Sequence, residues 1–207
     1  MKKGRTMPRM AAFLRGLRLL VVVTSLVGAT ILCAAPGAEH MTKVTGRSRQ
    51  GTQVEALAGF RGPTALAGGP VSVTLSPGSA LQGTTLASRL GALAPGDRIY
   101  LVLGDLAAQR QPGVLYHVFV DLPADSAAEE GDPRYVGAVN FYSARPGGSA
   151  SVFRSFDVTN LLRGLQERGL LSEQTKVTII PSRGGTVNTD ARPVIGRIEL
   201  VVQAKPR

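Results

Sequence analysis

The chain has 207 residues, enough for one domain of ordinary size and an extension, and its apolar content of 43% supports a packed core. The 25 glycines, the 13 prolines and the absence of tryptophan favour a turn-rich β protein over a helix bundle. Of the net charge of +10, the first 18 residues carry +6, whereas residues 71–203 contain 12 basic and 12 acidic side chains, which argues against a nucleic-acid interface.

The N-terminal segment predicts export. Residues 1–18 are basic, and the apolar run Leu19–Ala35 follows without a charge. This is the order of a secretory signal, with a cleavage point near Ala38. The run of 17 residues also reaches the lower limit of a membrane span, and the charge asymmetry would leave the rest of the chain outside the cytoplasm. Residues 1–37 are therefore interpreted as a signal peptide or an N-terminal membrane anchor, and the protein as periplasmic, extracellular or held on the outer face of the membrane.

The next segment has the composition of a linker. Residues 38–69 are rich in glycine and polar side chains, and they contain only a weak apolar patch near Ala56–Phe60. Such composition is typical of flexible connections. We expect a flexible linker over residues 38–69 and a folded domain over residues 70–207.

Short apolar runs separated by turn signals follow from residue 70 onward. Alternating or continuous apolar runs of this length are typical of strands. The runs are Val71–Leu75, Arg98–Leu103, Val114–Leu122, Tyr135–Tyr142, Ala150–Val158, Lys176–Ile180 and Val194–Val202. They predict a mainly β chain, an antiparallel β-sandwich of about seven or eight strands.

One short helix is predicted from about Thr159 to Gly169. Leucines at helical spacing give it one apolar face. Asp157 or Thr159 can cap its N-terminus, and Gly169 can take the left-handed position after its last turn. We expect this helix to cover an edge or an end of the sandwich.

Residues with catalytic or metal-binding chemistry are few. The chain has one cysteine, Cys33, and two histidines, His40 and His117. A zinc site needs three or four converging ligands, and a dicopper site needs a cluster of imidazoles. We therefore expect no metal, no cofactor and no disulfide within the chain.

The domain's single histidine lacks a predicted acid–base partner. Strand alternation places His117 on one face with Leu115, Phe119 and Asp121. Four residues of strand separate His117 from Asp121 by about 13 Å, too far for a hydrogen bond. A structural or surface histidine is thus favoured over a catalytic one.

Two loops also resemble functional motifs only in part. The acidic residues between Asp121 and Asp132 do not have the spacing of an EF-hand, so we expect a solvated loop. Ser182–Gly185 is basic and rich in glycine but lacks the end of a P-loop, so we expect a hairpin loop. With no nucleophile elbow either, the sequence predicts a protein that is not an enzyme.

Several motifs, taken together and in order, resemble a known family. They are Arg98–Leu106 (RIYLVLGDL), Tyr116–Pro123 (YHVFVDLP), Tyr135–Tyr142 (YVGAVNFY), Phe156–Thr159 (FDVT), Val177–Pro181 (VTIIP) and Ala191–Leu200 (ARPVIGRIEL). The chain between Val71 and Val202 is similar to the domain that follows the copper domain of tyrosinases and plant polyphenol oxidases. Phe156, Asp157 and Val158 resemble the structural Lys-Phe-Asp-Val motif of that domain, with Ser155 where lysine is usual.

The resemblance implies a β-sandwich that packs against a type-3 dicopper domain. In the family this domain covers the entrance to the copper site, and in some members one of its side chains occupies the substrate pocket. The two histidines of this chain cannot form the copper site, so oxidase activity is not carried over.

Two functions are compatible with this resemblance. The first is an exported, non-catalytic accessory domain that binds or caps a separately encoded tyrosinase-like oxidase. Its candidate interface or plug residues are Tyr100, Tyr116, Tyr135 and Tyr142. The second is an envelope module, tethered to the membrane by Leu19–Ala35, with a structural or ligand-binding role and no oxidase partner.

Overall fold

The computed structural model describes residues 54–66, 68–124, 126, 128–144 and 152–205. They belong to one compact unit, residues 48–207, which has its own hydrophobic core. The predicted signal peptide or anchor, and the part of the predicted linker before Val54, lie outside the described residues. In the part of the chain that is described, no helix has both the length and the apolar character needed to cross a membrane.

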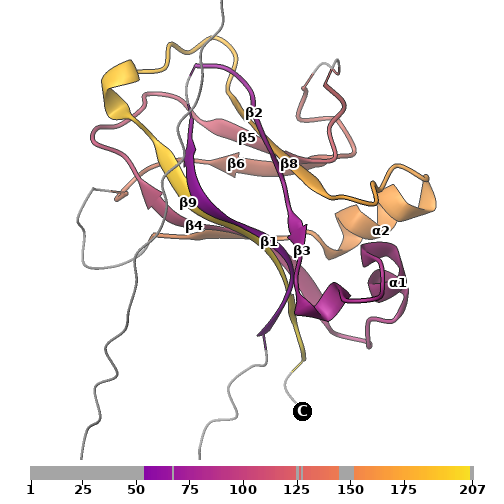
Figure 1. Cartoon of the computed structure of the whole chain (residues 1–207). Helices are drawn as coiled ribbons and strands as arrows, with labels where there is room; N and C mark the ends of the chain where they lie inside the picture. Colours follow the sequence, from indigo (N-terminus) through magenta and orange to yellow (C-terminus); the bar gives the residue numbers. More distant parts are fainter. Residues whose placement is uncertain (1–53, 67, 125, 127, 145–151, 206–207) are drawn as a thin grey trace, which may run out of the picture. The chain divides into compact units, whose positions relative to one another are not determined.

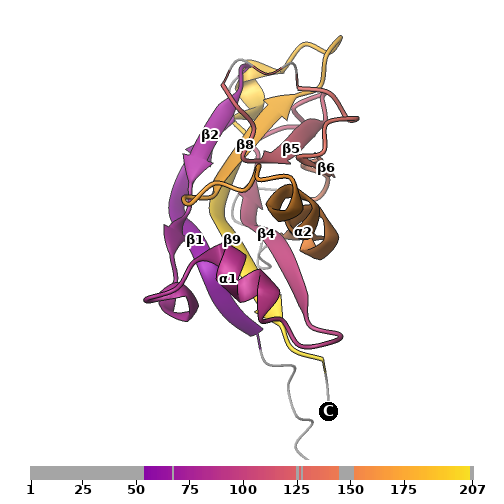
Figure 2. The ribbon, with the colours of Figure 1, turned by 90° about the vertical axis from the view of Figure 1, so that its right-hand side faces the viewer.

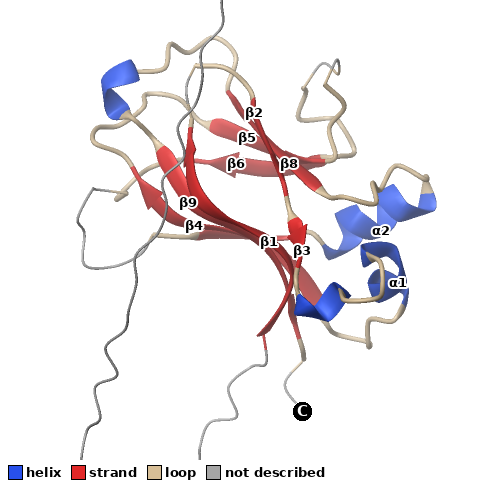
Figure 3. Ribbon diagram, viewed as in Figure 1, coloured by secondary structure: helices blue, strands red, loops and turns tan. Residues whose placement is uncertain are grey.

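Two antiparallel sheets face each other and enclose the core (Figures 1 and 3). The five-stranded sheet has the order β3 (Ser76–Pro77), β1 (Val54–Ala65), β9 (Val194–Gln203), β4 (Arg98–Ala107), β7 (Arg154–Asp157). The four-stranded sheet has the order β2 (Val71–Thr74), β8 (Lys176–Pro181), β5 (Tyr116–Val120), β6 (Tyr135–Val139). The predicted antiparallel β-sandwich is confirmed, with nine strands among the described residues, and all seven predicted runs contain a strand.

Strand alternation decides which side chains enter the core. On β9, Ile198 and Leu200 are fully buried in the core, while Glu199 between them points to the outward face. On β5, Tyr116 and Val118 are fully buried in the core, and His117 points outward. Each sheet thus presents one apolar face to the other sheet and one face of mixed character to the outside.

The predicted linker is wrong in its second half, because the domain begins at Val54 and not at residue 70. β1 pairs with β9 along its whole length, from Val54 opposite Gln203 to Ala65 opposite Val194. Its register shifts twice, and the second shift spans Gly62 and Pro63. These bulges break the alternation of apolar and polar residues that marks a regular strand. Because β1 also contains glycine and proline, its sequence resembles that of a linker.

Two helices close one end of the sandwich (Figures 1 and 2). α2 (Thr159–Glu167) is the predicted helix, it buries Leu162 and Leu165, and Gly169 after it has a left-handed φ of 65°. α1 (Leu86–Gly91) was not predicted, since six residues are too few to show a helical period. Two short 3₁₀ turns, Ser79–Leu81 and Thr189–Ala191, complete the described elements.

The N-cap of α2 is Val158, without a side-chain cap, so the prediction of Asp157 or Thr159 as the cap is wrong, but both residues connect the start of the helix to neighbouring elements. The Asp157 carboxylate accepts a hydrogen bond from the backbone N–H of Thr159 at 3.0 Å. The Thr159 hydroxyl oxygen accepts one from the backbone N–H of Ile99 on β4 at 2.8 Å. The start of the helix is therefore fixed to the five-stranded sheet.

The Phe-Asp-Val motif joins the edges of the two sheets. Phe156 lies on the edge strand β7, and its ring packs over Gly137 on the edge strand β6, where a Cβ atom would be 2.9 Å from the ring. Val158 is buried in the core and donates its backbone N–H to Ile99 O at 2.9 Å. Each of the three motif residues thus holds a junction of the sandwich.

Candidate functional site

A groove lies on the outward face of the four-stranded sheet, over β5 and β8. Its volume is about 670 Å³. Its lining is Pro70, Leu115, His117, Phe119, Ser126, Ala128, Glu129, Glu130, Ile180, Pro181, Ser182 and Arg183. We call this feature the groove throughout.

The floor of the groove follows from the strand pattern. Leu115, His117 and Phe119 share the outward face, as the alternation predicted. Ile180 of β8 pairs with His117 in the sheet, which adds a second apolar side chain beside the imidazole. Leu115 is 47% exposed, so the floor offers uncovered apolar surface.

One wall of the groove is the connection between β5 and β6. Its backbone turns at Asp132, whose N–H donates to Glu129 O at 3.0 Å and whose carboxylate accepts from the N–H of Arg134 at 2.8 Å. This turn places Glu130 over β5. Glu129 and Glu130 therefore line one side of the groove while remaining exposed to solvent, as the predicted solvated loop requires.

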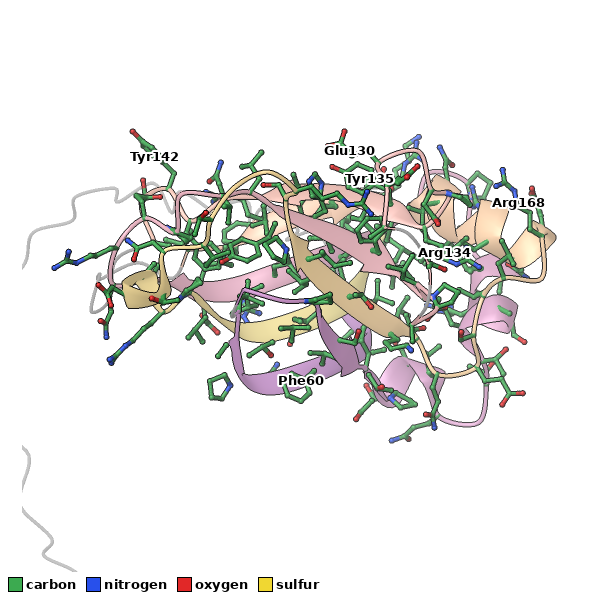
Figure 4. All side chains as sticks on the ribbon, turned by 90° about the horizontal axis from the view of Figure 1, so that it is seen from above. Phe60, Glu130, Arg134, Tyr135, Tyr142 and Arg168 are labelled. Atoms are coloured by element: carbon green, nitrogen blue, oxygen red, sulfur yellow. The ribbon has the colours of Figure 1, made fainter. Side chains whose placement is uncertain are left out.

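The polar side chains of Tyr135 on β6 and Glu130 in the β5–β6 connection both approach His117. Its Nδ1 lies 3.2 Å from the Tyr135 hydroxyl and 3.6 Å from Glu130 Oε1. The His117 side chain is 18% exposed, whereas that of Glu130 is 71% exposed. Figure 4 shows Glu130 and Tyr135 close together at the same rim of the molecule. The imidazole is thus held on one nitrogen, and its Nε2 has no hydrogen bond with any described residue.

The electrostatics of this cluster keep the Tyr135 phenol protonated. Partial burial and, secondarily, the negative charge of Glu130 raise the pKa of Tyr135 above its ordinary value. A phenol in this state remains available for its hydrogen bond with His117 over the whole physiological pH range. The cluster is suited to hold a ligand through hydrogen bonds.

The described residues hold few groupings of metal-binding or catalytic side chains. Within the described residues, no three His, Cys, Asp or Glu side chains converge as metal ligands. Ser126 and Ser182 line the groove, but neither hydroxyl is hydrogen-bonded to His117 in the described part of the chain.

Asp121 is a structural residue, and it is not on the face that alternation predicted. Its backbone has a left-handed φ of 53°, so the strand pattern ends there. Its carboxylate is buried and accepts hydrogen bonds from the N–H groups of Ser172 at 2.9 Å and Lys176 at 2.7 Å. Asp121 therefore fixes the connection that enters β8, and its carboxylate is engaged by backbone N–H groups.

The structure separates the four candidate tyrosines. Tyr116 is fully buried against Phe141, its hydroxyl has no partner among the described residues, and burial raises its pKa. It is a core residue and has no surface for a partner, which corrects its place among the interface candidates. Tyr100 is half-buried on β4, Tyr135 contacts His117 of the groove without lining it, and Tyr142 is 73% exposed.

Tyr142 belongs to a second exposed feature, which we call the Arg154 patch: Asn140, Tyr142, Phe153 and Arg154. Phe153 is 58% exposed. The Arg154 guanidinium donates to Phe153 O at 3.0 Å, to Asn140 Oδ1 at 3.3 Å and to Tyr142 O at 3.4 Å. In Figure 4, Tyr142 projects from the molecule far from Glu130, so the patch and the groove are separate surfaces.

The outward face of the five-stranded sheet carries an ion network. Glu199, only 10% exposed in its side chain, lies 2.9 Å from Arg61 and 2.8 Å from Arg197. Arg197 Nε is also 3.3 Å from Asp105 Oδ2. The Arg197 side chain lies across Gly104, where a Cβ atom would collide with it. This face is therefore covered by its own charged side chains.

The chain was compared with known families, curated proteins and solved structures. Residues 53–203 match the family described as a domain of unknown function (DUF7868). No curated protein matches. The structures found include recombinant latent aurone synthase, a polyphenol oxidase, at 15% identity and a TM-score of 0.44, covering 72% of this chain and 27% of that chain. Latent apple tyrosinase is 15% identical with a TM-score of 0.45, covering 69% and 27%. Latent aurone synthase from its natural source is 16% identical with a TM-score of 0.44, covering 72% and 27%.

These structures are polyphenol oxidases, the class that the sequence motifs indicated. The chain spans about a quarter of their length. At this identity the likeness concerns the fold alone.

Proposed function

We propose a function for this chain, which belongs to the DUF7868 family of domains of unknown function. It is an exported, non-catalytic accessory domain that binds a separately encoded tyrosinase-like dicopper oxidase. The observation that carries the proposal is the ordered set of motifs between Arg98 and Leu200, which resembles the domain following the copper domain of tyrosinases. The two histidines of the chain are too few to form the copper site itself. An activity linked to this resemblance would therefore need a partner.

The Arg154 patch is the surface that we assign to this partner. Exposed aromatic side chains next to an arginine are enriched where proteins bind one another. Tyr142 and Phe153 are two of the four large apolar side chains that the described residues leave exposed. Their backbone carbonyls are joined by one guanidinium, so the two rings are held in a common surface.

A pull-down from native envelope extract tests the proposal, with tagged residues 37–207 as the bait. We expect a histidine-rich dicopper oxidase to be recovered and identified by mass spectrometry. The double variant Tyr142→Ala with Phe153→Ala should lose it, while Leu115→Ala in the groove should retain it as the matched control. An extract that contains such an oxidase but yields none of it with the wild-type bait would contradict the proposal.

A second candidate is a membrane-tethered envelope module that binds a ligand and has no oxidase partner. The groove favours this candidate, because it is a concavity that combines apolar and polar side chains. The intact mass of the mature protein separates the two readings in part. A mass that includes the N-terminal segment would support the tethered module. The mass of a chain that begins near Ala38 would support the exported accessory domain.

A further inference from the structure

We propose that the groove binds a small molecule that carries a primary ammonium group on an apolar body. This site does not depend on an oxidase partner, and it is separate from the Arg154 patch. Its size is that of a small-molecule site, since about 670 Å³ falls within the range of 300–1,000 Å³ that such sites occupy. The ligand class follows from the arrangement of the lining.

The floor would receive the apolar body. Leu115, Ile180 and Pro181 lie along β5 and β8 and leave part of their surface accessible. Each methylene group that is removed from water at such a floor adds about 0.8 kcal/mol to binding. The floor alone does not distinguish an amine from an acid or an alcohol, so the polar wall must do so.

The wall on the β5–β6 side is built of hydrogen-bond acceptors. Glu129 and Glu130 are exposed carboxylates, and the Ser126 hydroxyl can also accept. Tyr135 and Glu130 both face Nδ1 of His117, so Nε2 is the ring nitrogen that has no hydrogen bond with a described residue. A primary ammonium has three N–H donors and no acceptor, so it matches this wall.

Arg183, the arginine of the lining, indicates which way round the ligand lies in the groove. Pro181 pairs with Tyr116 at the beginning of β5, so Arg183, two residues later, lies at the Leu115 end of the groove. The carboxylates of the wall come from the β5–β6 connection, and that of Glu130 lies 3.6 Å from Nδ1 of His117. The ammonium should therefore lie toward Glu129 and Glu130, and the apolar body toward Leu115.

Three probes of equal length test the charge preference: hexylamine, hexan-1-ol and hexanoate. They are titrated at neutral pH into ¹⁵N-labelled residues 48–207, after a dispersed spectrum has shown that this unit is folded. We expect saturable shifts at Leu115, His117 and Ile180 with hexylamine, and binding of hexanoate that is at least about tenfold weaker. Equal or tighter binding of hexanoate, or no saturable shift with hexylamine, would overturn the proposal.

Two exposed variants of opposite charge complete the test. Glu129→Gln should weaken hexylamine binding by about threefold to fivefold, in keeping with one partly exposed ion pair. Arg183→Gln, the matched control, should leave the affinity unchanged or raise it slightly. The amine site is wrong if Glu129→Gln has no effect, or if Arg183→Gln weakens binding as much as Glu129→Gln does.

Discussion

The polar side chains on the outward faces of the two sheets differ in how completely they are paired. On the five-stranded sheet, Glu199 is enclosed by Arg61 and Arg197, which also reaches Asp105. On the four-stranded sheet, His117 is held on one side by Tyr135 and Glu130, and its other nitrogen has no bond to any described residue. The first face resembles a closed structural network, and the second has unused hydrogen-bonding capacity beside accessible apolar surface.

The difference shows that charge content alone does not identify a binding surface. Both faces carry carboxylates and cations, and on the four-stranded sheet a turning connection also creates a concave wall beside the strands. A flat sheet face covered by flexible arginines excludes a ligand, whereas a wall next to exposed Leu115 can enclose one.

The largest expected effect concerns the closed network. Glu199→Gln should lower the free energy of unfolding by about 2 kcal/mol, because two arginines lose their common charged partner at a buried position. Urea denaturation measures this change. Glu129→Gln on the other face is the control and should change stability by less than about 0.5 kcal/mol. Equal effects of the two variants would remove the proposed contrast.

Replacing the tyrosine hydroxyls of β5 and β6 should change the free energy of unfolding less, and Tyr116→Phe should raise it. The Tyr116 hydroxyl is buried without a partner among the described residues, so Tyr116→Phe should stabilise the fold by about 1 kcal/mol. Tyr135→Phe removes the hydrogen bond to His117 and should destabilise the fold by about 0.5 kcal/mol. Thermal unfolding of both variants gives the comparison, and stabilisation by Tyr135→Phe would mean that its hydroxyl has no role in holding the imidazole.

The same two tyrosines predict a decline of stability in alkali. Their folded-state pKa values lie above the value of the unfolded chain, about 10. Above that pH the unfolded chain releases the phenol protons first, so the free energy of unfolding falls as the pH rises. Urea midpoints at pH 8 and pH 10.5 measure the decline, and Tyr116→Phe should make it smaller. An unchanged decline in that variant would show that Tyr116 does not contribute.

A further comparison of stabilities concerns Asp157 of the Phe-Asp-Val motif, where the edges of the two sheets meet. Asp157→Asn keeps an acceptor for the Thr159 N–H but removes the charge, so it should cost at most about 0.5 kcal/mol. Asp157→Ala removes the acceptor too and should cost about 1 kcal/mol. Helix α2 should then show faster amide exchange near Thr159. An Asp157→Ala variant as stable as wild type would show that the hydrogen bond between Asp157 and the Thr159 N–H does not contribute to stability.

The sequence is sufficient for the elements whose signal is local. Alternation on β5 places Leu115, His117 and Phe119 on one face, and leucine spacing predicts α2. β1 does not follow the rule, because the bulge over Gly62 and Pro63 hides its alternation and its pairing with β9 is distant in the sequence. Such a strand is recognised only when its partner is known.

The groove could be predicted only in part for a related reason. The position of His117 follows from the strand period, but its contacts with Glu130 and Tyr135 depend on how the β5–β6 connection turns at Asp132. That turn is set by hydrogen bonds that no simple period encodes. The exposure of Tyr142 and the burial of Tyr116 likewise depend on tertiary packing, although both residues are tyrosines in or beside a strand.

Hydrogen exchange of the bound chain tests the accessory role most directly. Exchange is measured by mass spectrometry on the chain alone and with the tyrosinase-like oxidase of the same cell. The account predicts slower exchange around Tyr142 and Phe153, and unchanged exchange around Arg197 and Glu199. Protection confined to β1 and β9 of the five-stranded sheet, or no protection anywhere at saturating oxidase, would contradict it.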